Sequence, residues 1–404
     1  MGAAAACELL GIKRQTLYAY ASRGQVRSAP GTGRERLYRR EDLERLSARS
    51  AARAGHGAVA AGALRWGEPV LDTAISGIAA EGPHYRGRPA VALARDGARF
   101  ETVAKWLWAG AWDTEVRFAA SDLGIDARRA SRLVPEHASP LDRLIAGTAL
   151  LAVAESGRAE PDPGALVRRF AAMLALAPGH EPRVAEALAA ESVASAVAIA
   201  LGARPTRRAI AAIDRALVLM ADHELNASTF ACRVAAGAGA DLHACMLAAL
   251  ATLSGPAHGR SCDRIEAMLA EARAPEDAAG VLRDRRRRGD AVPGFGHPLY
   301  RDGDPRTAPM LEDAWELAPR SATVRKVRAF ATAMELAGGE RAAVDTGLVA
   351  LAGALGMAPG SAAALMAVGR AAGWIAHAFE QRDAGYPLRP RARYSALART
   401  DGTE

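Results

Sequence analysis

The sequence predicts a mainly α-helical protein. Half of its 404 residues are hydrophobic but only 5% are aromatic, and much of the apolar content is Ala, Leu and Val, which favours closely packed helices over sheets. Several segments repeat apolar residues at spacings of three and four, as a helix with one buried face does. No part of the chain alternates strands with helices, so we do not expect a doubly wound sheet. The length allows two or three domains.

The first expected elements lie at the N-terminus. AAAACELLG (3–11) and KRQTLYAYASRG (13–24) each predict a short helix ended by a glycine. A strand, a hairpin rich in Pro and Gly, and a closing helix from about Arg40 follow. Two helices joined by a tight glycine turn are typical of the helix-turn-helix motif. Residues 3–47 resemble the winged helix-turn-helix of the MerR and excisionase-like families.

The net charge of +7 is concentrated in this segment, because residues 1–53 hold 11 Lys/Arg against 5 Asp/Glu. A basic module of this kind suits a polyanion. In the motif the second helix enters the DNA major groove, so the candidate DNA-binding residues are Lys13, Arg14, Gln15, Thr16, Arg34 and Arg36. The alternative is a small packing or dimerisation domain whose arginines are only solvated. A salt-dependent affinity for DNA would separate the two interpretations.

Successive helices are expected beyond Leu64. In FETVAKWLWAG (100–110) the spacing places five apolar residues on one face: Phe100, Val103, Ala104, Leu107 and Trp108. Similar patterns occupy 141–156, 207–224 and 242–253. Residues 346–369 carry no charge and are long enough to span a bilayer. Because Pro359 and Gly360 interrupt them, we predict two short buried helices and no membrane contact.

The cysteines and the N-terminus indicate the compartment. Cys7, Cys232, Cys245 and Cys262 form no C-x-x-C pair or disulfide framework. The first residues lack the pattern of a secretion signal. We therefore expect a cytoplasmic protein.

Three histidines stand in polar or glycine-rich segments: His223, His258 and His297. They are separated by 35 and 39 residues and form no H-E-x-x-H motif, so no metal site is expected. A glycine beside His258 and beside His297 lets a ligand approach closely, and a helix that begins after such a loop offers free N–H groups. These two histidines are the strongest candidates for chemistry.

Six motifs in this order resemble the citrate synthase family: ADHELNAST (221–229), LSGPAHG (253–259), VPGFGHPLYRDGDPR (292–306), AVD (343–345), GRAAGWIAHAFEQ (369–381) and PLRPRARY (387–394). The resemblance is strong over 210–394 and weaker at YRG (85–87) and 100–110. It implies citrate synthase-like large and small helical domains behind the winged helix-turn-helix. The expected boundaries are 1–50 for the helix-turn-helix, 51–65 for a linker, 66–259 with 366–404 for the large domain, and 260–365 for the small domain.

The resemblance implies condensation of acetyl-CoA with oxaloacetate and water to give citrate and CoA. Deprotonating the methyl group needs a base, which is Asp345 by position, and a donor that stabilises the enolate, which is His258. His297 matches the residue that polarises the ketone. His223 matches an oxaloacetate-binding histidine, with Asn226 close by.

The substrates' charges require further groups. Arg306, Arg370 and Arg389 match carboxylate-binding positions, the last lent by the other subunit of a homodimer. The resemblance places the CoA adenine against Val292, Pro293, Gly294, Phe295 and Gly296, and the CoA phosphates near Arg301. The run RDRRRRG (283–289) could attract phosphate, although a solvated face is the favoured interpretation. CoA is a substrate group here, and no cofactor is expected.

Several alternatives stay open. Asp345 could cap the following helix, and Arg370 could be a buried ion-pair partner. After His258 the family commonly has a Gly-Ala-Asn run where this chain has RSC (260–262), and Ala343 stands where Asn is common. The acyl substrate could therefore be propionyl-CoA, as in a 2-methylcitrate synthase. A metabolite-sensing DNA-binding regulator built on the same fold is the alternative from another class.

Overall fold

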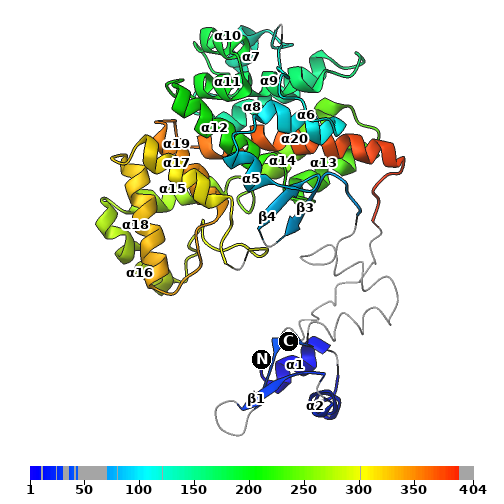
Figure 1. Ribbon diagram of the computed structural model, residues 1–404, viewed down its shortest axis with the longest axis vertical. Helices are drawn as coiled ribbons and strands as arrows, with labels where there is room; N and C mark the ends of the chain where they lie inside the picture. The colour runs from blue at the N-terminus through cyan, green and yellow to red at the C-terminus, as the bar shows by residue number, and fades with distance from the viewer. Residues whose placement is uncertain are drawn as a thin grey trace, which may run out of the picture. The chain divides into compact units, whose positions relative to one another are not determined.

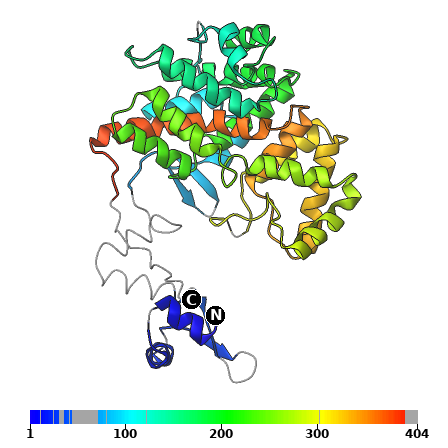
Figure 2. The same ribbon diagram turned by 180° about the vertical axis from the view of Figure 1, so that it is seen from behind.

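The computed structural model describes residues 1–10, 12–23, 25–30, 36–40, 42–43, 71–79, 81–120, 122–300 and 302–390. The chain divides into two compact units, Met1–Asp72 and Thr73–Glu404 (Figures 1 and 2).

The N-terminal unit contains two helices and a hairpin: α1 (Ala3–Leu10), α2 (Arg14–Ser22), β1 (Ser28–Pro30) and β2 (Arg36–Tyr38). The strands are antiparallel, with Ser28 opposite Tyr38 and Pro30 opposite Arg36. Its small core consists of Ala6, Leu17, Val26, Tyr38 and Leu43. Because two helices pack on a hairpin, the predicted winged helix-turn-helix is confirmed.

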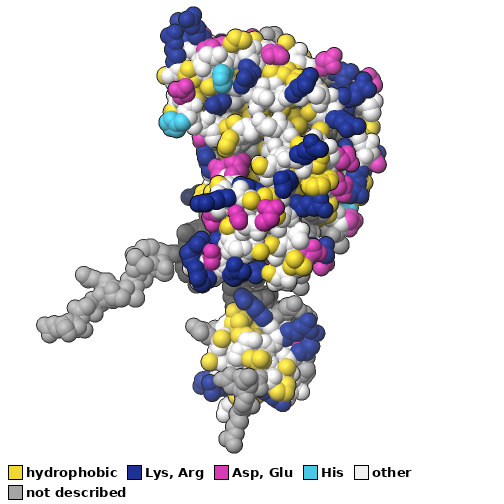
Figure 3. All heavy atoms as spheres, turned by 90° about the vertical axis from the view of Figure 1, so that its left-hand side faces the viewer, with side chains coloured by type: hydrophobic (Ala, Val, Ile, Leu, Met, Phe, Trp, Pro, Cys, Tyr) yellow, Lys and Arg dark blue, Asp and Glu magenta, His cyan; other side chains and the backbone are white. Residues whose placement is uncertain are grey.

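Most candidate DNA-binding residues are exposed in this unit. Lys13 is the N-cap of α2, and its side chain and those of Arg14, Gln15 and Arg36 face solvent, whereas Thr16 is half-buried. Arg34 lies outside the described residues. Lys and Arg side chains are prominent on the face of this unit in Figure 3, whereas both charge signs alternate over the other unit.

The second unit begins with a small antiparallel sheet that the sequence patterns did not predict. Its strands are β3 (Ser76–Ala79), β4 (Gly82–Tyr85) and β5 (Arg88–Pro89), paired in that order. The Tyr85 hydroxyl lies 3.0 to 3.2 Å from the carbonyl oxygens of Val218, Leu219 and Asp222 and can donate its one hydrogen to any of them. The sheet is thereby fixed to the segment that carries His223.

Helices form the rest of this unit. They are α5 (Ala90–Arg95), α6 (Phe100–Ala109), α7 (Ala127–Leu133), α8 (Pro140–Ala154), α9 (Pro163–Met173), α10 (Glu181–Ala189), α11 (Val193–Ala200), α12 (Arg207–Met220), α13 (Ala227–Gly237), α14 (Leu242–Leu253), α15 (Ser261–Glu271), η1 (Pro275–Asp277), α16 (Ala278–Arg288), α17 (Thr307–Leu317), α18 (Ala322–Leu336), α19 (Val344–Ala354) and α20 (Ser361–Ala384).

The helix predicted at 100–110 is present as α6, which ends at a left-handed Gly110 with φ of 69°. Phe100, Val103, Ala104 and Leu107 are fully buried, as predicted. Trp108 is only half-buried, although its indole N–H donates to the Ala372 carbonyl at 2.8 Å and its ring stacks on Phe118. Because Glu101, Thr102 and Trp106 are also buried, the buried face is wider than the spacing predicted.

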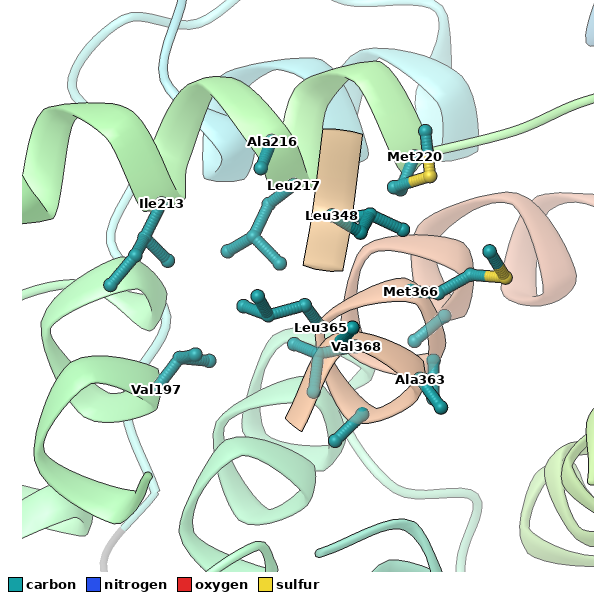
Figure 4. Close-up of a cluster of buried hydrophobic side chains, with 14 of the residues drawn as sticks. Val197, Ile213, Ala216, Leu217, Met220, Leu348, Ala363, Leu365, Met366 and Val368 are labelled. Atoms are coloured by element: carbon teal, nitrogen blue, oxygen red, sulfur yellow. The ribbon is translucent and has the colours of Figure 1, made fainter. Parts of the chain in front are cut away.

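Helix α20 is the central element of the unit. Figure 4 shows its side chains Leu365 and Val368 facing residues of α11, α12 and α19. The break at Pro359 and Gly360 is confirmed, because α19 ends at Ala354 and α20 begins at Ser361. The second helix is longer than predicted, because its buried side chains continue as far as Gln381 and the helix ends only at Ala384. It alone among the described helices is long and apolar enough to cross a membrane, and 94% of its apolar window is buried inside the unit.

Two groups of helices can be distinguished within this unit. Helices α15 to α19 lie to one side of the bundle around α20 in both Figures 1 and 2. The start of α13 is bonded to α20 through Ser228 and Trp374, and the start of α15 is bonded to the start of α19 through Ser261 and Asp345.

Candidate active site

His223 lies on the loop between α12 and α13, where only 8% of the residue is exposed. Its Nε2 is 2.8 Å from the hydroxyl of Tyr300. Burial, and then the positive charges of Arg306 and Arg370, lower the pKa of His223 well below its ordinary value. The ring is therefore neutral near pH 7.

Asn226 is the N-cap residue of α13. Its Oδ1 accepts from the backbone N–H groups of Ser228 and Thr229, and its Nδ2 donates to the Thr229 hydroxyl at 2.9 Å. Oδ1 also accepts the Ser228 hydroxyl at 2.7 Å. Because the amide is bonded within the protein on both sides, Asn226 orders the start of α13 in this structure.

His258 is joined to this cap through Ser228. Its Nε2 lies 2.9 Å from Ser228 Oγ, which also accepts the Trp374 indole N–H at 3.2 Å. Because the Ser228 hydrogen points to Asn226, His258 Nε2 carries a hydrogen in this arrangement. Burial, and then Arg370, lower the pKa of His258 to about 4. With Nε2 engaged, Nδ1 is the nitrogen left for a ligand.

His297 lies edge-on to His223, with ring centroids 5.5 Å apart, and 4.9 Å from the Tyr300 ring. Its Nδ1 accepts the Leu299 backbone N–H at 3.1 Å, so the neutral ring carries its hydrogen on Nε2. Burial and Arg306 lower the pKa of His297. It is therefore a neutral donor.

Arg306 forms a buried ion pair with Asp304. Its Nε and Nη2 bond the two carboxylate oxygens at 3.0 and 2.7 Å, and both side chains are at most 2% exposed. Nη1 is the guanidinium nitrogen that Asp304 does not bind. Arg306 therefore has a protein partner that the sequence did not indicate.

Arg370 lies in the middle of α20 and differs from Arg306 in its contacts. Its residue is 4% exposed, and its Nε and Nη1 are buried without a hydrogen bond from the part of the chain that the structure describes. Burial lowers the pKa of Arg370, and the charge of Asp222 opposes this shift. The described residues thus leave two donors of a buried cation unused, and Asp222 is its largest compensating charge.

Asp345 lies in the first turn of α19 and does not cap it, because the N-cap residue is Ala343. Its Oδ1 instead accepts the Ser261 hydroxyl at 2.6 Å and the Cys262 thiol at 3.7 Å. The capping alternative is therefore wrong.

The loop 292–296 holds the start of α19. The Gly294 carbonyl accepts from the Ala343 N–H at 2.8 Å and from the Thr346 hydroxyl at 2.7 Å. Gly294 has a φ of 84°, and a Cβ there would lie 2.4 Å from Thr346 Oγ1. This glycine is therefore required by the protein's own packing. Val292, Pro293, Phe295 and Gly296 complete the predicted CoA loop, whereas Arg301 lies outside the described residues.

Two predicted basic groups lie elsewhere. Arg389 is exposed and follows α20, in a segment that packs against Gly237 at the far end of α13. Ala384 is about 20 Å along α20 from Arg370, at 1.5 Å per residue. In the run 283–289, Arg285 binds Glu271, Arg287 binds Asp284 and Arg288 binds Asp290. These ion pairs agree with the favoured interpretation of a solvated face.

The structure thus brings together six predicted residues: His223, His258, His297, Arg306, Asp345 and Arg370. Ser228, Trp374, Tyr300 and Asp304 were not singled out from the sequence. Tyr300 and Asp304 do lie within VPGFGHPLYRDGDPR, close to His297, and that proximity was the available signal. The arrangement can bind an anion beside neutral donors and a carboxylate base.

Comparisons with known proteins identify the family. Residues 63–391 match the family model for the citrate synthase C-terminal domain, and residues 1–49 match a helix-turn-helix domain. Citrate synthase 2 of Bacillus subtilis is 32% identical over 48% of this chain, a match that spans about half of that protein's length, 53%. The 2-methylcitrate synthase of Shewanella oneidensis is 28% identical over 82% of this chain and 94% of the relative. Citrate synthase of Saccharolobus solfataricus is 32% identical over 65% of this chain and 74% of the relative.

Solved structures agree on the fold. Citrate synthase of Thermoplasma acidophilum, in a complex with carboxymethyl coenzyme A and oxaloacetate, has a TM-score of 0.71 at 23% identity, over 83% of this chain and 96% of that one. The Thermotoga maritima enzyme has a TM-score of 0.61 at 22% identity, over 84% and 96%. Because the family match covers most of the chain, this protein belongs to the citrate synthase family and carries a helix-turn-helix domain at its N-terminus.

Proposed function

We propose that the second unit is an acyltransferase that condenses acetyl-CoA with oxaloacetate and water to give citrate and CoA. One observation carries this proposal: the Arg370 guanidinium is buried with unused donors beside histidines that stay neutral. A buried unpaired cation is costly. A dicarboxylate supplies the missing anion, and the neutral histidines supply hydrogen bonds without repelling each other.

The residues have distinct parts in the proposed reaction. Asp345 takes a proton from the acetyl methyl group, and the C–H electron pair forms the enolate. His258 stabilises the thioester oxygen through Nδ1. This requires the Ser228 hydroxyl to turn its hydrogen to Nε2, which Asn226 tolerates because its Oδ1 keeps two backbone donors. The enolate carbon attacks the ketone carbon, and His297 donates its Nε2 hydrogen to the new alkoxide. Water then hydrolyses the thioester and releases CoA.

The substrate carboxylates and CoA require the remaining groups. We assign one carboxylate to Arg370 and the other to Arg306 through Nη1, with His223 beside them. Arg389 is assigned to the site of the partner in a homodimer, since its own chain places it beyond the end of α20. The loop 292–296 and Arg301 are the proposed contacts for CoA, which is consumed as a thioester and is not a resident cofactor.

The test is thiol release from acetyl-CoA and from propionyl-CoA in the presence of oxaloacetate. The unaltered chain is compared with Asp345→Ala, His297→Ala and the control His137→Ala, an exposed histidine between α7 and α8. We expect release that both site substitutions reduce at least about 100-fold, while the control retains it. No oxaloacetate-dependent release from either thioester refutes the enzyme proposal.

The same assay determines whether the preferred acyl substrate is acetyl-CoA or propionyl-CoA. One methylene is worth only about 1–3 kcal/mol of discrimination in a pocket, and the relatives include both citrate synthases and 2-methylcitrate synthases. A higher kcat/KM with propionyl-CoA would make this chain a 2-methylcitrate synthase.

A second candidate function is DNA binding by the N-terminal unit. The observation that favours it is the exposure of Lys13, Arg14 and Gln15 at the start of α2, the end of a recognition helix that contacts base edges. A metabolite-sensing regulator would combine this binding with little turnover, and with a DNA affinity that changes with oxaloacetate or CoA.

The DNA proposal is tested with the full chain and a pool of duplex DNA at several salt concentrations. We expect binding that weakens with salt, and a slope of log K against log salt that falls by about one for Arg14→Ala. The control Arg129→Ala, on exposed α7 in the second unit, leaves the slope unchanged. No salt-dependent binding by the unaltered chain would leave the module a packing or dimerisation domain.

A further inference from the structure

The first turn of α15 contacts the proposed base. Ser261 donates its hydroxyl to Asp345 Oδ1 at 2.6 Å, and Cys262 directs its thiol to the same oxygen at 3.7 Å. Cys262 is fully buried. These two residues stand where the sequence departs from the small Gly-Ala-Asn run of the family, so the departure places two donors on the carboxylate.

The same turn carries His258. The Ser261 N–H donates to the His258 carbonyl at 2.9 Å, and the Cys262 N–H donates to the Gly259 carbonyl at 3.3 Å. Residues 258–262 thus form one hydrogen-bonded turn with the enolate-stabilising imidazole at one end and the donors to the base at the other. A displacement of this turn moves both groups together.

The backbone of Asp345 is held separately. Ala343 and Thr346, on either side of it, both bond the Gly294 carbonyl. With the backbone fixed from the loop 292–296, the orientation of the carboxylate depends on what binds its oxygens. Ser261 binds Oδ1, which leaves Oδ2 as the oxygen that can accept a proton.

We propose that Ser261 is a positioning residue that holds Asp345 Oδ1, so that Oδ2 faces the acyl group. Cys262 supports it as a weak second donor. Ser261 keeps its own proton throughout: the methyl proton passes to Oδ2, and the C–H electrons pass into the enolate. The inference rests on the proposed condensation.

The experiment measures kcat and KM for thiol release with the full chain. For Ser261→Ala we expect kcat to fall about 3- to 30-fold with KM for the thioester within about twofold, because the hydroxyl binds the base and not CoA. Ser261→Thr, which keeps the hydroxyl, should restore most of the rate.

Ser321→Ala is the matched control. Ser321 also donates its hydroxyl to α19, but to the Gly353 carbonyl at the opposite end of the helix, at 3.1 Å. Its kcat and KM should match those of the unaltered chain. If Ser261→Ala does not fold, Ser261→Cys provides a weaker donor of similar size, for which we expect an intermediate kcat.

Three results would overturn the inference. Turnover by the unaltered chain with the same kcat and KM for Ser261→Ala refutes the positioning role alone and leaves the proposed function intact. No turnover by the unaltered chain refutes the proposed function, and the positioning role with it. A loss of kcat that Ser261→Thr fails to rescue identifies Ser261 as a packing residue.

Discussion

Arg306 and Asp304 form a two-pronged ion pair that is almost completely buried, with N–O distances of 3.0 and 2.7 Å. The pair belongs to the segment that carries His297 and Tyr300, and the Arg306 cation lies 5.7 Å from the Tyr300 ring. Asp304 thus fixes the orientation of the cation for which we propose a substrate carboxylate as ligand.

Replacing Asp304 by Asn should destabilise the protein by about 3–5 kcal/mol, because it leaves a buried cation without its counter-ion. Burial alone raises the pKa of Asp304, but Arg306 lowers it more, so the folded-state pKa lies below the unfolded value. The stabilisation is then present above about pH 4 and is lost as the pH falls through the folded-state value. Urea unfolding at pH 7 and pH 3.5 checks this. If Asp304→Asn lowers the free energy of unfolding by the same amount at both pH values, the prediction is contradicted.

Arg370 should behave in the opposite way. Replacing it by Met removes a buried cation with unused donors, so we expect an unchanged or higher melting temperature without ligand, and loss of the stabilisation by oxaloacetate. Arg168→Met is the matched control. Arg168 is 1% exposed but bonds the carbonyls of Phe118 and Ser192, so its replacement should lower the melting temperature and keep the response to oxaloacetate. A lower melting temperature for Arg370→Met with an intact ligand response would refute the assignment.

The sequence predicted the helical class and six residues that meet in the site. It could not distinguish a capping Asp345 from one bound by Ser261, because that contact joins residues 84 positions apart. The same holds for Ser228, whose contact with Trp374 spans 146 positions. Spacing identifies a buried face but not the partner across it, which is also why the short strands β3 to β5 were missed.

His258 should make the protein less stable in mild acid. Its pKa of about 4 in the folded chain lies below the ordinary value of about 6.5, so the unfolded chain binds more protons between these pH values. Stability therefore falls as the pH drops from 6.5 to 4, by up to about 3 kcal/mol for this group. Unfolding of His258→Gln should show a correspondingly weaker pH dependence. His137→Gln, which replaces an exposed histidine, should keep the pH dependence of the unaltered chain. If the curves of stability against pH coincide for the unaltered chain, His258→Gln and His137→Gln, the lowered pKa of His258 is contradicted.

Substitutions at Gly294 and Gly289 distinguish the cost of a left-handed backbone from an effect on the position of Asp345. Both have positive φ, 84° and 77°, but a Cβ on Gly294 would meet Thr346 and Ile265, at 2.4 and 2.7 Å, whereas Gly289 has open space. Each change to Ala should cost about 1–2 kcal/mol of stability from the left-handed backbone. Only Gly294→Ala should also reduce kcat, at least about tenfold, because the collision displaces the start of α19 and with it Asp345. Equal activity of the two variants would show that the loop does not position the base.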